Sequence, residues 1–100
     1  MTLKPYTYIT MSMRRGEPSR VSVYFNSVDL RARAWLGETG NPCFDLDTSD
    51  GSVTVSTAGP VTDQDLTVAR EIFNAAARYL GDCERLHSEQ TAKATADEAA

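Results

Sequence analysis

The sequence predicts an α+β domain, with a five-stranded antiparallel meander sheet and one C-terminal helix packed on one face in two layers. Apolar residues alternate with polar ones from Tyr8 to Thr57, a period of two that is typical of strands with one buried face. From Leu66 to His87 they recur every three or four residues, as on an amphipathic helix. The strand connections are short, which favours antiparallel neighbours, because parallel crossovers need a dozen or more residues.

Five strand segments are expected, each with one apolar and one polar face. Residues 8–13 and 21–26 come first, separated by the turn-forming sequence RRGEPS. Residues 30–36 follow and end at GETGNP, whose Gly and Pro break the pattern. Residues 43–47 and 52–56 are joined by TSDG, which is a hairpin signal. The apolar faces together predict one sheet with a side that the helix covers.

The helix is expected to begin at Asp63. Thr62 lies three residues before Asp65, which resembles a capping box with an acidic third residue. The apolar stripe then continues as far as His87, although Gly81 is a residue at which helices end or bend.

One hundred residues fit a single domain. Residues 1–87 are predicted to form it, while residues 88–100 contain no large apolar side chain and are predicted to form a disordered or frayed Ala-rich tail. Two cysteines cannot make a disulfide framework, and no basic start leads into an apolar stretch. We therefore expect a cytoplasmic protein with free thiols and no membrane span.

The net charge of -4 is unevenly distributed. Residues 1–36 hold six basic and two acidic side chains, whereas residues 37–100 hold four basic and twelve acidic ones. Such a bipolar chain can orient towards a charged partner, although an ordinary solvated surface explains any single charge.

Cys83 and His87 are four residues apart and share one helix face. A zinc site needs about four ligands, and a Cys-His nucleophile needs a third group to orient the base. The chain supplies neither, since Cys43 is expected on the opposite face of the sheet. Phosphate-binding, protease and dinucleotide motifs are absent, and the run DLDTSDG does not complete a calcium loop. We predict a non-enzymatic protein without metal or cofactor.

The length of the helix suggests a homodimer. From Asp63 to His87 it would run about 37 Å, whereas strands of six or seven residues span about 20 to 23 Å. The last turns would then extend past the sheet and need a partner, which a second copy of the same segment can supply. The dimer seam predicted in this way consists of Leu80, Cys83, Leu86 and His87.

The polar face of the sheet is the candidate binding surface. It is predicted to gather aromatic and arginine side chains, the types that dominate binding hot spots: Tyr8, Tyr24, Arg31, Arg33 and Trp35. The alternative reading is cross-strand pairing on an ordinary strand exterior. We expect a protein partner, and a role as an inhibitor or accessory factor of the phage or mobile-element type.

Two other functions stay open. Single-stranded nucleic acid stacks on aromatics and contacts arginines, although net acidity counts against it. The acidic half of the chain, including Asp45, Asp47 and Asp50, would alternatively imitate a phosphate backbone and inhibit a nucleic-acid-binding protein. Quenching of Trp35 fluorescence by short single strands would separate the first of these functions from protein binding.

Overall fold

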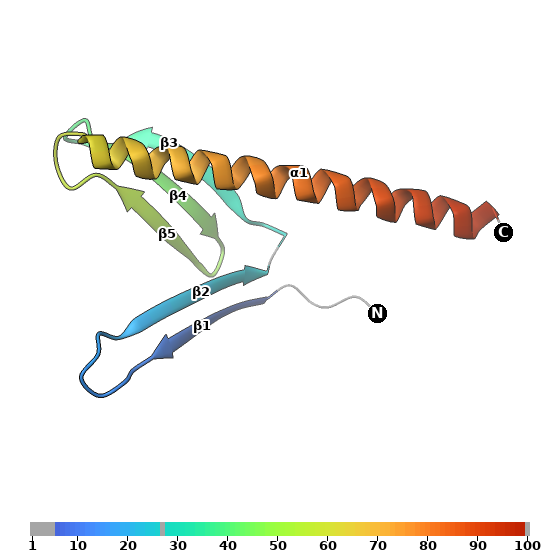
Figure 1. Cartoon of the computed structure of the whole chain (residues 1–100), viewed down its shortest axis with the longest axis horizontal. Helices are drawn as coiled ribbons and strands as arrows, with labels where there is room; N and C mark the ends of the chain where they lie inside the picture. Colours follow the sequence, from blue (N-terminus) through green and yellow to red (C-terminus); the bar gives the residue numbers. More distant parts are fainter. Residues whose placement is uncertain (1–5, 27, 100) are drawn as a thin grey trace. The chain divides into compact units, whose positions relative to one another are not determined.

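The computed structural model describes residues 6–26 and 28–99. Five strands precede one helix, and all strand pairs are antiparallel, which confirms the predicted α+β class (Figure 1). The elements are β1 (Tyr6–Ser12), β2 (Arg20–Asn26), β3 (Arg31–Leu36), β4 (Pro42–Thr48), β5 (Gly51–Ser56) and α1 (Asp63–Ala99). The chain forms two compact units, which divide between Pro60 and Val61. The packing of α1 on a sheet face stays a prediction.

The five strands form two sheets, so the prediction of a single five-stranded sheet was wrong. One sheet is the β1-β2 hairpin and the other has the order β3-β4-β5. The connection between β2 and β3, residues 27–30, contains no glycine, although tight hairpins favour residues that accept positive φ. The carboxylate of Asp29 instead accepts a hydrogen bond of 3.0 Å from the backbone N–H of Ser49. This bond ties the connection to the turn between β4 and β5.

The β1-β2 hairpin has two chemically distinct faces. Its register pairs Tyr8 with Tyr24 and Ile9 with Val23, so that side chains alternate between a face of tyrosines and polar residues and a largely apolar face. Gly16 has a φ of 80° in the turn, and the backbone N–H of Glu17 donates to the carbonyl of Arg14 at 3.1 Å. A left-handed third residue of a turn is the position at which glycine is favoured.

The β3-β4-β5 sheet is joined by two tight turns. Between β4 and β5 the hydroxyl of Thr48 accepts the N–H of Asp50 at 3.1 Å and donates to the carbonyl of Gly51 at 3.3 Å. The TSDG segment therefore forms the hairpin turn that the sequence predicted. Between β3 and β4, Gly40 has a φ of 83° and its N–H donates to the carbonyl of Gly37 at 2.9 Å.

The helix begins with the predicted capping box. The N–H of Thr62 donates to the Asp65 carboxylate at 2.9 Å, and the N–H of Asp65 donates to the Thr62 hydroxyl at 3.1 Å. These two bonds satisfy backbone donors that the first turn leaves without a helical partner.

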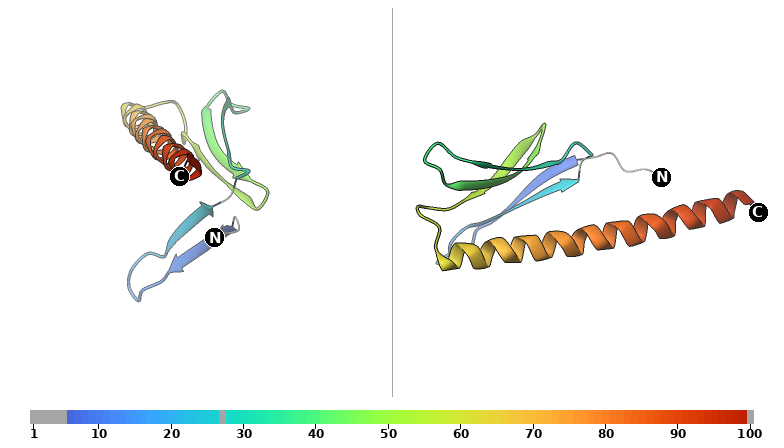
Figure 2. Two further views of the ribbon diagram at one scale, coloured as in Figure 1. Left: turned by 90° about the vertical axis from the view of Figure 1, so that its right-hand side faces the viewer. Right: turned by 90° about the horizontal axis from the view of Figure 1, so that it is seen from above.

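The helix passes Gly81 without interruption and continues to Ala99, through residues that were predicted to form a disordered or frayed tail (Figure 2). The segment after Ser88 is rich in alanine, the residue with the highest helix propensity. An ion pair between Arg85 and Glu89 at 3.3 Å also crosses into it. High local propensity therefore continues the helix where large apolar residues are missing.

No hydrophobic side chain is buried within the part of the chain that the structure describes. The two buried residues there are Asp45 and Thr48, both in β4. Large apolar groups are exposed in both units, for example Met13 in the first and Phe73 in the second. This amount of exposed apolar surface is typical of chains that associate with another polypeptide.

Candidate functional site

The five predicted binding residues lie on two different sheets. Tyr8 and Tyr24 are on the β1-β2 hairpin, whereas Arg31, Arg33 and Trp35 occupy alternate positions of β3. The candidate site therefore consists of two separate surfaces, which are described in turn.

The first surface is a stack of three tyrosines on the hairpin. The rings of Tyr8 and Tyr24 face each other across the strands with centroids 4.6 Å apart and planes within 9°. Tyr6 continues the stack along β1, with its ring 5.7 Å from that of Tyr8. Sequence reasoning missed Tyr6, although its spacing of two from Tyr8 places it on the same strand face. All three rings stay partly exposed, which leaves aromatic edges for a ligand.

The second surface is centred on an ion pair across β3 and β4. Arg33 lies opposite Asp45 in the register and donates two hydrogen bonds to its carboxylate, from Nη2 at 3.0 Å and from Nε at 3.3 Å. Asp45 is only 3% exposed, and Arg33 gives this buried carboxylate a hydrogen-bonded partner of opposite charge. The hydrogen bonds to Asp45, and the negative charge of that carboxylate, raise the pKa of Arg33.

Trp35 lies beside this ion pair. The guanidinium carbon of Arg33 is 5.8 Å from the centre of the Trp35 ring, within the range of a cation–π contact. The indole remains 42% exposed. The register places Arg31 opposite Asp47 and Trp35 opposite Cys43 on the same face, with the small polar side chains of β5 beyond them. This surface is named the Trp35 face, and consists of Arg31, Arg33, Trp35, Cys43, Asp45 and Asp47.

The pairing of Arg33 was not predicted from the sequence, which grouped Arg33 with Arg31 as a partner-binding residue. The alternation of Asp45 and Asp47 on the facing strand was the available signal, because opposite charges across an antiparallel pair attract. Only the register shows which arginine meets which carboxylate.

The predicted dimer seam lies along α1. Leu80 is 59% exposed, and Cys83, Leu86 and His87 are exposed as well. The thiol of Cys83 also hydrogen-bonds with Tyr79, and this bond raises the pKa of that phenol. Both Cys43 and Cys83 are free thiols.

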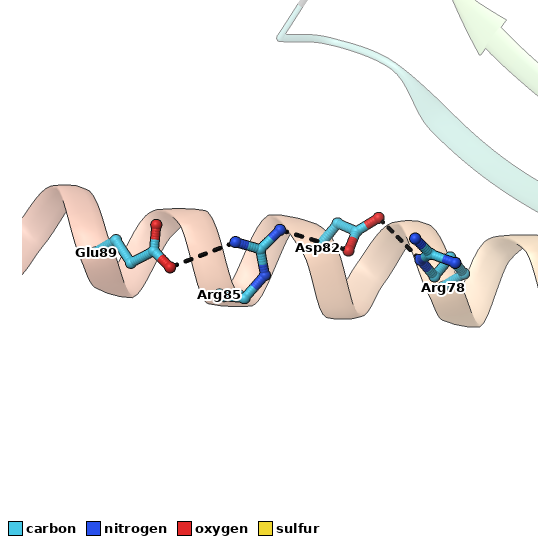
Figure 3. A network of polar contacts seen from close by, with 4 residues as sticks. All are labelled: Arg78, Asp82, Arg85 and Glu89. Atoms are coloured by element: carbon cyan, nitrogen blue, oxygen red, sulfur yellow. Dashed lines mark hydrogen bonds and ion pairs between the residues drawn. The ribbon is translucent and has the colours of Figure 1, made fainter.

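A chain of ion pairs follows another face of α1 (Figure 3). Arg78 contacts Asp82 at 3.3 Å, Asp82 contacts Arg85 at 3.8 Å, and Arg85 contacts Glu89 at 3.3 Å. Exposed pairs of this kind contribute little to stability individually. Together they place two basic and two acidic side chains along one side of the helix.

No group of three or more His, Cys, Asp or Glu side chains within residues 6–26 and 28–99 is placed to hold a metal ion. The described part of the chain also has no helix with the length and apolar character that crossing a membrane requires.

No protein-family model matches the chain, and neither the curated proteins nor the solved structures contain a match. The functional proposal therefore rests on the geometry of the two surfaces and the helix.

Proposed function

We propose that this chain is a small non-enzymatic interaction protein that binds a protein partner through the Trp35 face. The observation that carries the proposal is the position of Arg33, which the buried carboxylate of Asp45 holds beside an indole that is 42% exposed.

This arrangement favours binding because the side chain of Arg33 is already ordered before a partner binds. Two hydrogen bonds fix the guanidinium of Arg33, and the guanidinium in turn covers part of the Trp35 ring. Ordering a rotamer-rich side chain on binding is unfavourable, so a surface ordered in advance binds with less loss of entropy. Trp and Arg are also the side chains most enriched among interface hot spots.

The charges favour protein over nucleic acid. Phosphate binding depends on cationic side chains whose charge is not already compensated. Arg33 is paired with Asp45, and Arg31 lies opposite Asp47. With a net charge of -4 over the whole chain, the Trp35 face suits a mixed polar and aromatic protein surface better than a polyanion.

The proposal includes two further features. Two free cysteines fit the reducing cytoplasm, where the protein would serve as an inhibitor or accessory factor of a larger assembly. The exposed apolar residues of α1 support a homodimer in which the helices of two copies meet.

The proposal is tested by affinity capture from a lysate of the source cells. The binding variant is Arg31→Gln/Trp35→Ala, which removes one charge and the indole but keeps the ion pair of Asp45. The matched control is Arg15→Gln/Met13→Ala, which makes the same kind of change in the exposed β1-β2 connection. We expect a protein that the wild type and the control capture and the binding variant loses.

Two results would contradict the proposal. Equal capture by all three proteins would show that the Trp35 face is structural. Quenching of Trp35 fluorescence by short single-stranded nucleic acid at low salt, weakening steeply as salt rises, would instead assign the face to nucleic acid.

A further inference from the structure

Three exposed apolar residues of α1 follow a seven-residue repeat. Leu66, Phe73 and Leu80 are seven residues apart, and each is followed three residues later by a small side chain: Ala69, Ala76 and Cys83. Spacings of three and four that sum to seven are the pattern of a helix that packs along another helix. Leu66, Phe73 and Leu80 are 45%, 72% and 59% exposed, so the repeat is open to a partner.

Four charged residues of α1 are separated from this repeat. Arg78, Asp82, Arg85 and Glu89, linked by the ion pairs of Figure 3, occupy the side of the helix turned away from the repeat, given a turn of 3.6 residues. The helix therefore has one face for solvent and one face for a partner.

We infer that the α1 helices of two copies pack antiparallel along this repeat, in a register that places Phe73 of one copy against Ala76 of the other. This inference rests on the homodimer proposed above and specifies its geometry. In the same register, Leu66 meets Cys83 of the second copy and Ala69 meets Leu80. Every contact layer then joins one large and one small side chain, the alternation that fills a helix interface without voids.

A parallel arrangement fills the interface less well. It would place Phe73 against Phe73 and Ala76 against Ala76, so that oversized layers alternate with layers too small to fill the gap. Cavities of this kind are destabilising. The alternation of large and small residues therefore favours the antiparallel direction.

Charge complementarity supports the same register. In the proposed register, Ala69 shares a layer with Leu80 of the second copy. Arg70 directly follows Ala69, and Glu84 of the second copy lies one helical turn after its Leu80. Arg70 of each copy is thus beside Glu84 of the other, on the edge of the interface where oppositely charged residues specify orientation. The twofold symmetry of the dimer repeats this pair.

A second antiparallel register lacks this support. It would pack Ala69, Ala76 and Cys83 against the neighbouring apolar row of Ile72, Tyr79 and Leu86 of the second copy. Asp82 would then lie beside an apolar Val68, and Arg70 and Glu84 would fall outside the contact. The proposed register therefore uses Leu80 and Cys83 of the predicted seam, while Leu86 and His87 lie beside or beyond it.

Disulfide trapping tests the register, with Cys43→Ser as the background that leaves Cys83 as the native thiol. Leu66→Cys should give a covalent dimer under mild oxidation, because residues 66 and 83 of different copies share a layer. The matched control Thr67→Cys points away from the interface and should not. The Cys43→Ser parent should not crosslink either, since its two Cys83 residues are seventeen residues apart along the axis, or about 26 Å, far beyond the Cα separation that a disulfide spans.

A second pair of cysteine substitutions tests the same register in case Leu66→Cys itself prevents dimerisation. Ala69→Cys/Leu80→Cys, in a background without Cys43 and Cys83, should also crosslink between copies. Arg70→Glu should raise the dimer dissociation constant roughly tenfold, because it removes both Arg70–Glu84 ion pairs at the edge of the interface. Arg70→Glu/Glu84→Arg should return the dissociation constant to the wild-type value.

The outcomes separate the register from the dimer itself. A monomer mass by light scattering at high concentration would overturn both the homodimer and its geometry. A dimer in which Cys83 crosslinks to Cys83 would overturn the antiparallel direction, and a dimer without either designed crosslink would overturn the register, while leaving the homodimer intact.

Discussion

Arg31 and Arg33 occupy equivalent positions in the sequence but different environments in the sheet. Arg33 neutralises a carboxylate that is 3% exposed, whereas Arg31 faces a less buried Asp47. Truncation of Arg33 should therefore reduce stability through Asp45, because it leaves a buried carboxylate without its partner.

The measurement is urea denaturation of Arg33→Ala beside the matched control Arg31→Ala. We expect the unfolding free energy to fall clearly for Arg33→Ala and to change by less than about 0.5 kcal/mol for Arg31→Ala, as is usual for surface sites. Equal losses in the two variants would show that the ion pair with Asp45 has no special role.

Tyr79 gives a prediction about pH. Its hydrogen bond with Cys83, together with the charge of the thiolate, raises the pKa of the Tyr79 phenol. Cys83→Ala should therefore lower that pKa towards the ordinary value of about 10. The pKa of Tyr79 is raised in the folded protein. The contribution of Tyr79 to the free energy of unfolding is therefore fully present below the pKa of Tyr79 in the unfolded chain, and it is lost as pH rises through the pKa in the folded protein.

The pKa of Tyr79 can be followed by tyrosinate absorbance, as the difference between each protein and its Tyr79→Phe counterpart. Cys43→Ala is the control, since Cys43 belongs to β4, where its thiol hydrogen-bonds with Asn41. An unchanged Tyr79 titration in Cys83→Ala would rule out the proposed contact.

At the level of single elements, the start of α1 depends on Thr62. Thr62→Ala removes the acceptor for the N–H of Asp65 and should destabilise the helix by about 1 kcal/mol. Thr67→Ala is the control, because Thr67 lies within the helix and alanine has the higher propensity there. Thermal unfolding followed by circular dichroism should show a loss for the first variant alone, and similar behaviour of both would exclude the capping role.

Gly81 is the residue with the lowest helix propensity in α1. It lies inside α1, and a methyl group added there would meet nothing within 4 Å. Gly81→Ala should therefore stabilise the helix by up to about 1 kcal/mol, since glycine is the less favourable residue in a helix interior. A lower thermal midpoint for Gly81→Ala would show that the helix needs a bend at this position.

The elements were predictable where the signal is local. The capping box of Thr62 and Asp65 and the turn after Thr48 each depend on side chains that bond to backbone a few residues away. The split into two sheets has no such local signal, and the hydrogen bond from Ser49 to Asp29 joins residues that are twenty apart. The pairing of Arg33 with Asp45 is similarly a matter of strand register, which alternation alone leaves open.

At the level of the whole molecule, stability and association are linked. The described chain leaves large apolar side chains exposed in both units. Burial of such groups is the main favourable term in folding, so a partner that covers them stabilises the folded state. A dimer of this chain should therefore unfold at a temperature that depends on protein concentration.

The last prediction tests this linkage. The thermal midpoint of the wild type should rise with protein concentration, because mass action favours the associated folded state. Phe73→Ser removes the most exposed large residue of the proposed helix interface and should abolish the dependence. Val28→Ser is the matched control, since Val28 is 93% exposed but lies in the connection between β2 and β3. If the wild-type midpoint is constant across concentrations, the exposed face of α1 is not covered by a second copy.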